Sequence, residues 1–282
     1  MEIEVEVDSD GISLAGNFYT PDGLGKERIP GVVLAHGFAG ARYPAMSEHL
    51  ASLGYCVLGF DFRGYGRSGG ERGNVLPREQ VSDIRNAVTW LENRPEIDPN
   101  SIAVIGSSLG GSIAVMASAD DKRIKACVAG CPLAHGDAAL RKLYDTEEKL
   151  QAFMKKVEKT KQENGRLARF EIVFIPPNLR NFLPPGTPME FTADTVYGFL
   201  SLNPLEVIER IAPRPVFIIH AEDDHVVPVK DAHELKSRAG ANCDLEVIPT
   251  GDHFIFGAKP VMEKIGSWLV KAFPPGSVGK SA

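Results

Sequence analysis

The stretch Val104–Gly111, which reads Val-Ile-Gly-Ser-Ser-Leu-Gly-Gly, decides the fold of this chain. It holds the pattern Gly-x-Ser-x-Gly between an apolar run and a segment of small residues. A strand that turns sharply into a helix and raises a serine at the turn has this pattern, because flanking glycines let the backbone bend tightly. Ser108 is at the tip of the predicted turn, and the rival Ser107 is expected to hydrogen-bond locally. Since short Gly-Ser patterns recur by chance, the rest of the chain must supply partners.

Composition places the chain among ordinary globular proteins. Of its 282 residues, 43% are hydrophobic and 24% are charged, enough for one large core. The net charge of −6 is spread along the chain without a Lys/Arg cluster, which argues against nucleic-acid and membrane partners. Residues 1–8 lack the pattern of a signal peptide and no apolar run is long enough to span a bilayer, so a cytoplasmic protein is expected. Four cysteines are expected to be buried, reduced thiols: Cys56, Cys127, Cys131 and Cys243.

Apolar strand signals alternate with helix signals along the chain. This alternation predicts an α/β fold with a mostly parallel, eight-stranded sheet and helices on both faces. Residues 2–8 and 11–20 are expected to form a hairpin that adds antiparallel edge strands. The other strands are expected at residues 32–35, 55–60, 101–105, 124–129, 215–220 and 245–248. Helices are expected at residues 44–53, 79–93 and 260–273.

One segment interrupts this alternation. Between residues 132 and 203 no buried strand of the main sheet is predicted. A helix is expected from a capping box at Asp145–Glu148 to about residue 164, and another from Thr192 to Leu202. Such an insertion between two strands is typical of a lid, and the alternative is a peripheral subdomain that never touches substrate. The predicted organisation is a core of residues 1–133 and 204–275, a lid of residues 134–203, and a flexible tail of residues 276–282.

A serine nucleophile needs a base that takes its proton and an acid that holds this base in place. Both residues are expected in the loops that follow the last two predicted strands. The acid should follow the strand at residues 215–220, where Asp223 and Asp224 stand. The base should follow the final strand, where Thr250-Gly251-Asp252-His253 is found. The order Ser, Asp, His then reads Ser108, Asp224 and His253.

The other histidines have simpler interpretations. His49 and His233 fall in helices and are expected at the surface, while His220 ends a strand and is expected to be buried and satisfied. His220, Asp223 and His225 could be imagined as metal ligands, but no second cluster has ligand spacing. We therefore expect no metal and no cofactor.

Five features together resemble the α/β-hydrolase superfamily over nearly the whole chain. They are His36-Gly37-Phe38, the loop Asp61–Ser68, the turn at Ser108, the Asp224 loop that ends in Val227-Pro228, and Gly251-Asp252-His253. Within that superfamily the chain looks most similar to bacterial carboxylesterases with small lids and to the dienelactone-hydrolase and acyl-peptidase-like groups. In those groups a Gly-x-x-Asp-x-x-Val-Pro loop presents the acid, which favours Asp224 over Asp223. Ala221 replaces the usual glycine of that loop, and Ser107 stands where many relatives have His or Glu.

The resemblance implies the α/β-hydrolase fold and a serine hydrolase that cleaves a carboxylic ester. Ser108 would be the nucleophile, His253 the general base, and Asp224 the residue that orients the base. The N–H of Leu109 would form one half of an oxyanion hole, and by analogy with the family the N–H of Phe38 would form the other. Arg63 and Arg67 in the loop Asp61–Ser68 are expected to form ion pairs rather than to bind substrate.

Several alternatives stay open. The same residues could cleave an amide or a thioester, and a ligand receptor without activity is the alternative outside the enzymes. An ester is favoured over a peptide because no propeller domain is present to screen peptides. The expected partner is a small acyl ester. The sequence does not determine the oligomeric state, and a homodimer is one of the possible states. Aromatic candidates for the pocket wall, each of which could instead be lid core, are Phe38, Phe174, Phe182, Tyr197 and Phe199.

Overall fold

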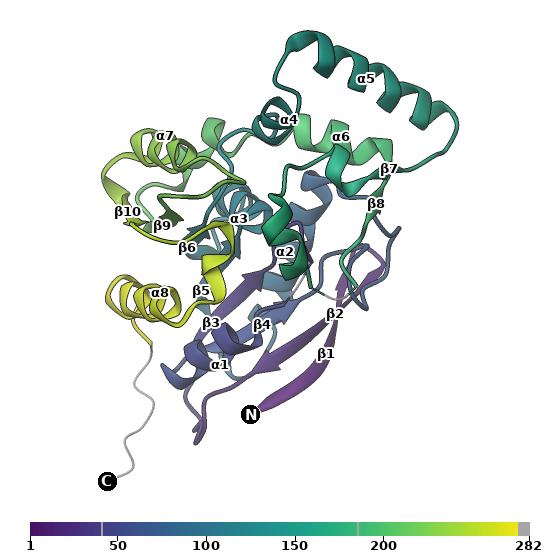
Figure 1. Cartoon of the computed structure of the whole chain (residues 1–282). Coiled ribbons are helices and arrows are strands. Elements are labelled where there is room, and N and C mark those ends of the chain that lie inside the picture. Colours follow the sequence, from purple (N-terminus) through teal and green to yellow (C-terminus); the bar gives the residue numbers. More distant parts are fainter. Residues whose placement is uncertain (41, 185, 276–282) are drawn as a thin grey trace.

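The computed structural model describes residues 1–40, 42–184 and 186–275. Its core is a sheet of eight strands in the order β1-β2-β4-β3-β5-β6-β9-β10 (Figure 1). The strands are β1 (Glu2–Ser9), β2 (Ile12–Tyr19), β3 (Ile29–Ala35), β4 (Cys56–Phe60), β5 (Ile97–Ser107), β6 (Ile124–Gly130), β9 (Val216–Ala221) and β10 (Cys243–Ile248). β1 pairs with β2, and β2 with β4, in antiparallel fashion, and all other pairs are parallel. The predicted mostly parallel sheet with an antiparallel hairpin at its edge is therefore confirmed.

Two apolar layers fix the helices on opposite faces of the sheet. α1 (Pro44–Ser52) and α8 (Lys259–Ala272) share one hydrophobic cluster with one face. α2 (Pro77–Glu92), α3 (Leu109–Asp120) and α7 (Val229–Ala239) share the other. Every residue of β3, β4 and β9 is buried, as expected of parallel strands covered on both sides. The edge strand β1 is largely exposed.

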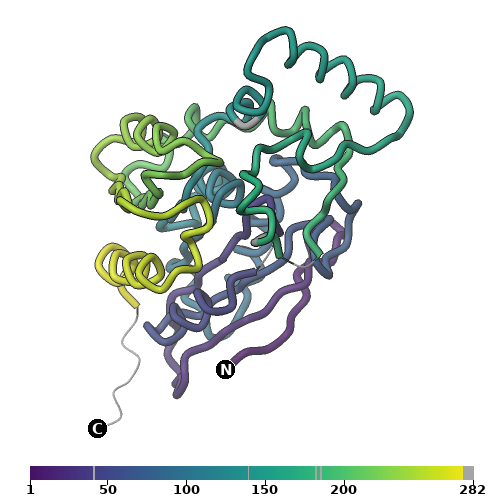
Figure 2. The backbone as a smooth tube through the Cα atoms, viewed as in Figure 1, coloured from purple at the N-terminus to yellow at the C-terminus, as the bar shows by residue number. Residues whose placement is uncertain are grey.

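The described residues between β6 and β9 contribute no strand to the main sheet, as predicted. They form α4 (Ala138–Leu143), α5 (Glu147–Gln162), α6 (Ala193–Leu200), a small antiparallel sheet of β7 (Leu167–Ala168) and β8 (Glu190–Phe191), and short 3-10 turns. We call residues 131–215 the insertion. Its backbone extends beyond the main body, with α5 outermost (Figure 2).

The sequence predicted the longer helices of the insertion and missed its short elements. The hydroxyls of Thr146 and Thr192 accept hydrogen bonds from the backbone at the starts of α5 and α6, as expected of N-caps. By contrast, α4 and the two-residue strands β7 and β8 are too short to leave a periodic pattern. The predicted tail, residues 276–282, lies outside the described part of the chain.

Candidate active site

The serine of the opening motif lies at the tight turn between β5 and α3. Ser108 has φ 56° and ψ −126°, a conformation that costs a residue with a Cβ free energy. The turn closes only because its neighbours lack side chains: a Cβ on Gly106 would lie 2.1 Å from the carbonyl oxygen of Gly110. A Cβ on Gly110 would lie 2.2 Å from the carbonyl oxygen of His36. The backbone N–H of Ser108 donates to Gly130 at 2.7 Å, which ties the turn to β6.

Three side chains that are far apart in the sequence form one hydrogen-bonded chain here. The Nε2 atom of His253 lies 2.7 Å from the Oγ of Ser108, and its Nδ1 atom lies 2.7 Å from the Oδ2 of Asp224. Because an ionised carboxylate can only accept, Nδ1 carries the proton and Nε2 is left to accept from the serine. Ser108, His253 and Asp224 are the three residues that the sequence singled out, and Asp223 is exposed on the surface.

The environment of Asp224 keeps it ionised. Burial alone would raise the pKa of Asp224, but the electrostatic interaction with His253 and hydrogen bonds from His220, His253 and Val227 outweigh burial and hold this pKa well below its usual range. Its Oδ1 atom accepts from the N–H groups of Val226 and Val227, each at 2.8 Å. An acceptor saturated in this way is a fixed negative charge behind the imidazole.

His220 supports the acid, a role that the sequence did not indicate. Its Nε2 atom is 3.0 Å from the carbonyl oxygen of Val227 and 3.3 Å from the Oδ2 of Asp224. Since the Val227 carbonyl can only accept, Nε2 carries the proton. The Nδ1 atom is buried with no hydrogen-bond partner among the described residues, so the expectation of a fully satisfied imidazole was wrong. The spacing of four residues to Asp224 was the available signal.

Two backbone N–H groups lie next to the serine turn or in the loop that approaches it. Leu109 follows Ser108 at the first position of α3, where N–H groups have no partner within the helix. No hydrogen bond among the described residues uses the N–H of Leu109 or of Phe38. Gly37 allows the two segments to approach, because a Cβ there would lie 2.9 Å from the Cβ of Ser108. These are the two groups predicted to form an oxyanion hole.

His36 fixes the loop that carries Phe38. Its Nε2 atom accepts from the N–H of Phe62 at 3.0 Å, so its Nδ1 atom must carry the proton that is donated to Gly37 at 2.8 Å. Complete burial lowers the pKa of His36, which keeps the ring neutral. A neutral ring with a single tautomer holds the loop in one position.

The insertion also holds this loop. The guanidinium of Arg169 donates through Nη2 to the carbonyl oxygen of Phe38 at 3.0 Å, and Thr187 donates to the carbonyl oxygen of Ala39 at 2.8 Å. The guanidinium also lies over the rings of Phe38 and Phe191, at 4.6 and 5.1 Å from their centroids. No sequence pattern indicates a role for Arg169, because residues 167–171 have no clear period.

A cavity of about 230 Å³ opens beside Ser108. It is lined by the oxyanion loop, the serine turn, the His253 loop and residues of the insertion: Gly37, Phe38, Ala39, Gly40, Tyr43, Ser107, Ser108, Arg169, Val173, Ile175, Leu183, Pro184, Val226, His253, Phe254, Phe256 and Gly257. Of the predicted aromatic wall, Phe38 lines it. Phe199 instead packs edge-on against Phe38, and Tyr197 is exposed on α6. The side chain of Phe182 lies outside the described residues.

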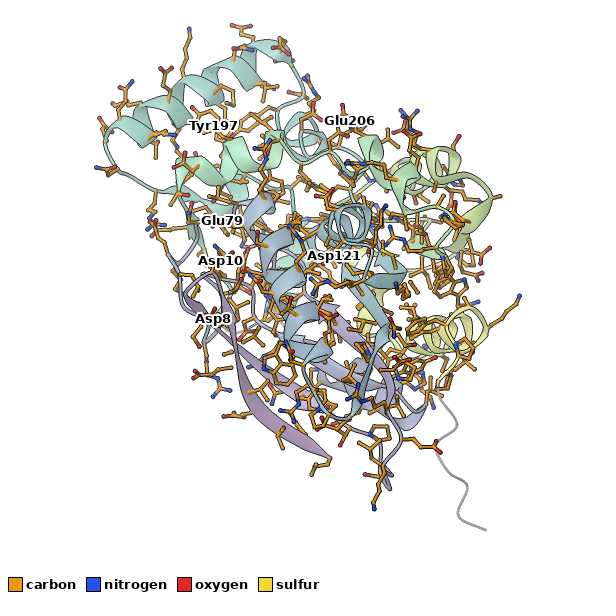
Figure 3. The ribbon with its side chains drawn as sticks, turned by 180° about the vertical axis from the view of Figure 1, so that it is seen from behind. Asp8, Asp10, Glu79, Asp121, Tyr197 and Glu206 are labelled. Atoms are coloured by element: carbon orange, nitrogen blue, oxygen red, sulfur yellow. The ribbon has the colours of Figure 1, made fainter. Side chains whose placement is uncertain are left out.

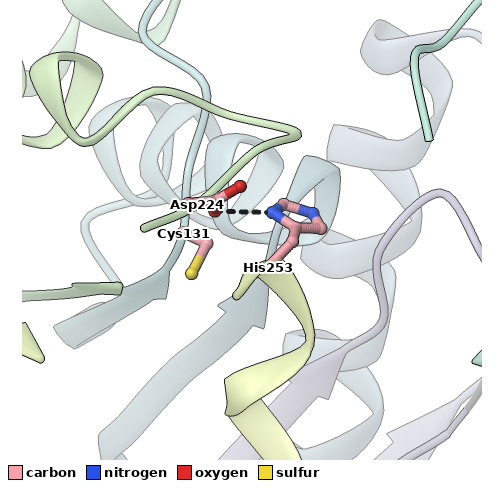
Figure 4. Close-up of side chains that lie close together, drawn as sticks. All are labelled: Cys131, Asp224 and His253. Atoms are coloured by element: carbon pink, nitrogen blue, oxygen red, sulfur yellow. Dashed lines mark hydrogen bonds and ion pairs between the residues drawn. The ribbon is translucent and has the colours of Figure 1, made fainter. Parts of the chain in front are cut away.

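The buried thiol of Cys131 lies beside the acid (Figure 4). Ligand atoms of Cys131, Asp224 and His253 lie within 4.8 Å of one another, the spacing of a metal site. However, a metal-binding thiol must lose its proton, and burial raises the pKa of Cys131 well above its usual value. Both ring nitrogens of His253 are also engaged by Asp224 and Ser108. The hydrogen bonds of Asp224 and His253 are therefore more typical of proton transfer through His253 than of a cation site.

The remaining candidates lie apart from the serine. His225 and His233 are exposed, while His49 is half-buried with its Nε2 atom enclosed, contrary to the expected surface position. The four cysteines are buried and free, as predicted.

Both arginines of the loop 61–68 form ion pairs, which confirms that expectation. Arg63 lies 2.7 Å from the carboxylate of Asp83, and Arg67 lies 2.7 Å from that of Glu4. Asp10 and Glu79, which lie near one another on the back of the molecule, also approach Arg63 (Figure 3).

Comparison with known proteins gives the chain a family context. Residues 30–260 match the family described as alpha/beta hydrolase fold. An uncharacterized 31.7 kDa protein of Escherichia coli is 38% identical over 132 residues, which are 46% of this chain and 45% of that one. The chain thus spans less than half the length of that relative.

Proteins that match a larger share of the chain have lower sequence identity. The thiohydrolase apmlB of Arthrinium phaeospermum is 30% identical over 79% of this chain and 80% of its own. The crystal structure of the alpha/beta hydrolase GrgF from Penicillium sp. sh18 superposes with a TM-score of 0.81 at 23% identity, covering 97% of this chain and 99% of that one. Polyketide transferases and esterases are also among the similar proteins. No helix among the described residues is long and apolar enough to cross a membrane.

Proposed function

Because this chain belongs to the alpha/beta hydrolase fold family, we propose that it is a serine hydrolase that cleaves a carboxylic ester through an acyl-enzyme. The observation that carries the proposal is the continuous chain of hydrogen bonds from Ser108 through His253 to Asp224. A ligand receptor would not need a serine held in a strained turn against a base. The strain of Ser108 therefore favours an enzyme.

In the first step Ser108 attacks the ester carbonyl. The Oγ proton passes to the Nε2 atom of His253, which accepts it at 2.7 Å. The imidazolium that forms is stabilised by Asp224, whose lowered pKa keeps its charge in place. The carbonyl oxygen becomes negative and is bound by the N–H groups of Leu109 and Phe38, with the start of α3 favouring the anion.

In the following steps the proton moves on. His253 donates it from Nε2 to the leaving alkoxide, which leaves an acyl group on Ser108. Water then attacks this acyl group, with His253 as base again, and the acid is released. Each proton moves within the reach of one imidazole nitrogen, so no further acid or base is required.

The insertion supplies the substrate specificity in this proposal. Residues 134–203 act as a lid, since Arg169, Val173, Ile175, Leu183 and Pro184 line the cavity. A cavity of about 230 Å³ is below the usual range for drug-sized ligands, which favours a small acyl group.

A thioester is the second candidate substrate, and a specific likeness favours it. The thiohydrolase apmlB is 30% identical over most of both chains. Attack on a thioester uses the same residues, and the sulfur leaves with less need of a proton from His253. The esterase Est1E from Butyrivibrio proteoclasticus, solved with ferulic acid, shares only the fold at 22% identity.

Paired substrates test the proposal. We would compare ethyl butyrate, S-ethyl thiobutyrate and butyranilide by kcat/KM, with Ser108→Ala as the inactive variant and Ser107→Ala as the matched control. We expect the oxoester to be cleaved and Ser108→Ala to lose about four to six orders of magnitude in kcat. Ser107→Ala should keep most activity. Failure to cleave any of the three, or faster cleavage of the anilide, would overturn the proposal.

A further inference from the structure

The active-site cavity contains a buried cation, Arg169, that has no carboxylate partner among the described residues. Arg169 is 1% exposed and lines the cavity, and none of the other described residues in that lining is Asp or Glu. Buried guanidinium groups are normally paired, because removing a charge from water is costly. Burial lowers the pKa of Arg169 to about 10, and the group still carries its charge at neutral pH. Some acceptor that the described residues do not supply would compensate this charge.

The protein satisfies only part of this guanidinium. Nε donates to the carbonyl oxygen of Pro188 at 2.9 Å, and Nη2 donates to that of Phe38 at 3.0 Å. An arginine has five N–H donors, so three of them have no acceptor among the described residues. Both partners are neutral carbonyls, so the residues that the structure describes place no negative charge against this guanidinium.

The position of the guanidinium sets where its missing acceptor can be. Phe38 accepts from Arg169 through its carbonyl and offers its N–H to the oxyanion, and these two atoms of one residue are roughly 3 Å apart. An anion bound by Arg169 is therefore only a few bonds from the carbonyl that Ser108 attacks. The substrate that satisfies both groups at once therefore has a short chain between its scissile carbonyl and its anion.

We propose that the cavity selects esters that carry a carboxylate about four to six carbon atoms from the scissile carbonyl, with Arg169 as the group that binds this carboxylate. This inference rests on the proposed function and names its substrate class. Stacking on Phe38 and Phe191 keeps the planar fork in place, so two parallel N–H groups can face the carboxylate. The apolar side chains Val173 and Ile175 line the path along the chain of the substrate.

Matched esters test this preference. On the acyl side we would compare monoethyl glutarate with ethyl 5-methylhexanoate, in which an isopropyl group replaces the carboxylate. On the alcohol side the pair is 4-acetoxybutanoate and 4-methylpentyl acetate. The measured quantity is the ratio of kcat/KM for the charged ester to that for its neutral partner, followed by proton release at constant pH. We expect the wild type to favour at least one charged ester.

Variants then assign the preference to Arg169. We expect Arg169→Met to lower that ratio by about 10- to 100-fold through KM, and Arg169→Lys, which keeps the charge, to recover part of it. Arg180→Met is the matched control, because Arg180 also stacks on a ring, that of Phe170 at 4.2 Å, but is exposed and outside the cavity lining. Equal losses for charged and neutral esters in Arg169→Met would make the residue purely structural and overturn the inference.

A binding measurement separates this inference from the proposed reaction. The affinity of monoethyl glutarate would be measured by calorimetry for Ser108→Ala and for Ser108→Ala combined with Arg169→Met. At least a ten-fold weaker affinity in the double variant supports the carboxylate site. This holds even if the wild type cleaves none of the esters, a result that would overturn the esterase proposal alone. Equal affinities would sink the carboxylate site and leave the esterase proposal intact.

Discussion

The strained backbone of Ser108 allows a prediction about stability that is independent of substrate. At φ 56° and ψ −126° a residue with a Cβ costs about 1–3 kcal/mol relative to an ordinary conformation, and glycine avoids most of this cost. Glycine also loses about 0.5–1 kcal/mol through the greater entropy of its unfolded chain. We therefore expect Ser108→Gly to be more stable than Ser108→Ala by about 0.5–2 kcal/mol.

The comparison between these two variants isolates the backbone. Both lose the hydrogen bond from Oγ to Nε2 of His253, so this loss cancels in the difference. Urea unfolding followed by circular dichroism gives the free energy of unfolding of each variant, provided that the slopes against urea agree.

The neighbouring serine is the control. Ser107 ends β5 and is absent from the residues with positive φ. There the order should reverse, with Ser107→Gly about 0.5–1 kcal/mol less stable than Ser107→Ala. If Ser108→Gly were equal to or less stable than Ser108→Ala, the strain would not exist and the account of the turn would be refuted.

Three further predictions follow from the same structure. Because the pKa of Asp224 in the folded protein lies below the unfolded value of about 3.9, its charge stabilises the fold fully above that pH. This contribution begins to fall near the unfolded pKa and is lost progressively as the pH approaches and passes the lower folded pKa. Urea unfolding at pH 6 and pH 3.5 should thus show a smaller acid loss for Asp224→Asn than for the wild type, and equal losses would contradict the lowered pKa. Gly110→Ala should lower the free energy of unfolding by about 3 kcal/mol, since its Cβ would lie 2.2 Å from a backbone oxygen. Gly25→Ala is the control and should change the free energy of unfolding little, because a Cβ there meets nothing within 4 Å. Similar free energies of unfolding for the two variants would refute the close approach at Gly110. The four buried cysteines should react with a thiol reagent only in denaturant, and rapid reaction of the folded protein would contradict their burial.

The fold could be predicted from the sequence because its strands and longer helices have local hydrophobic patterns. Runs such as residues 102–105 are apolar throughout, and parallel strands covered on both faces require such runs. The resemblance to the α/β-hydrolase superfamily is confirmed by the family match over residues 30–260. The strand that leads to Ser108 begins four residues earlier than predicted, because Asp98, Pro99 and Asn100 interrupt the apolar pattern after Ile97.

The sequence could place Ser108, Asp224 and His253 because each follows a strand, and strand ends meet at one edge of a parallel sheet. It could not find Arg169, whose position depends on how the insertion folds back on the oxyanion loop. The pocket wall was predicted poorly for the same reason: Phe256 and Tyr43, which line it, come from segments with no distinctive pattern. Long-range packing of irregular segments leaves no periodic trace.

Covalent labelling tests the central claim most directly. The folded protein would be treated with a fluorophosphonate, digested and mapped by mass spectrometry, with His253→Ala as a variant that lacks the base. We expect one adduct, on Ser108, and labelling slowed by several orders of magnitude in His253→Ala, because the serine is activated only through Nε2 at 2.7 Å. Folded protein that stays unlabelled, or that carries the adduct on Ser107, would contradict the assignment of Ser108 as a nucleophile.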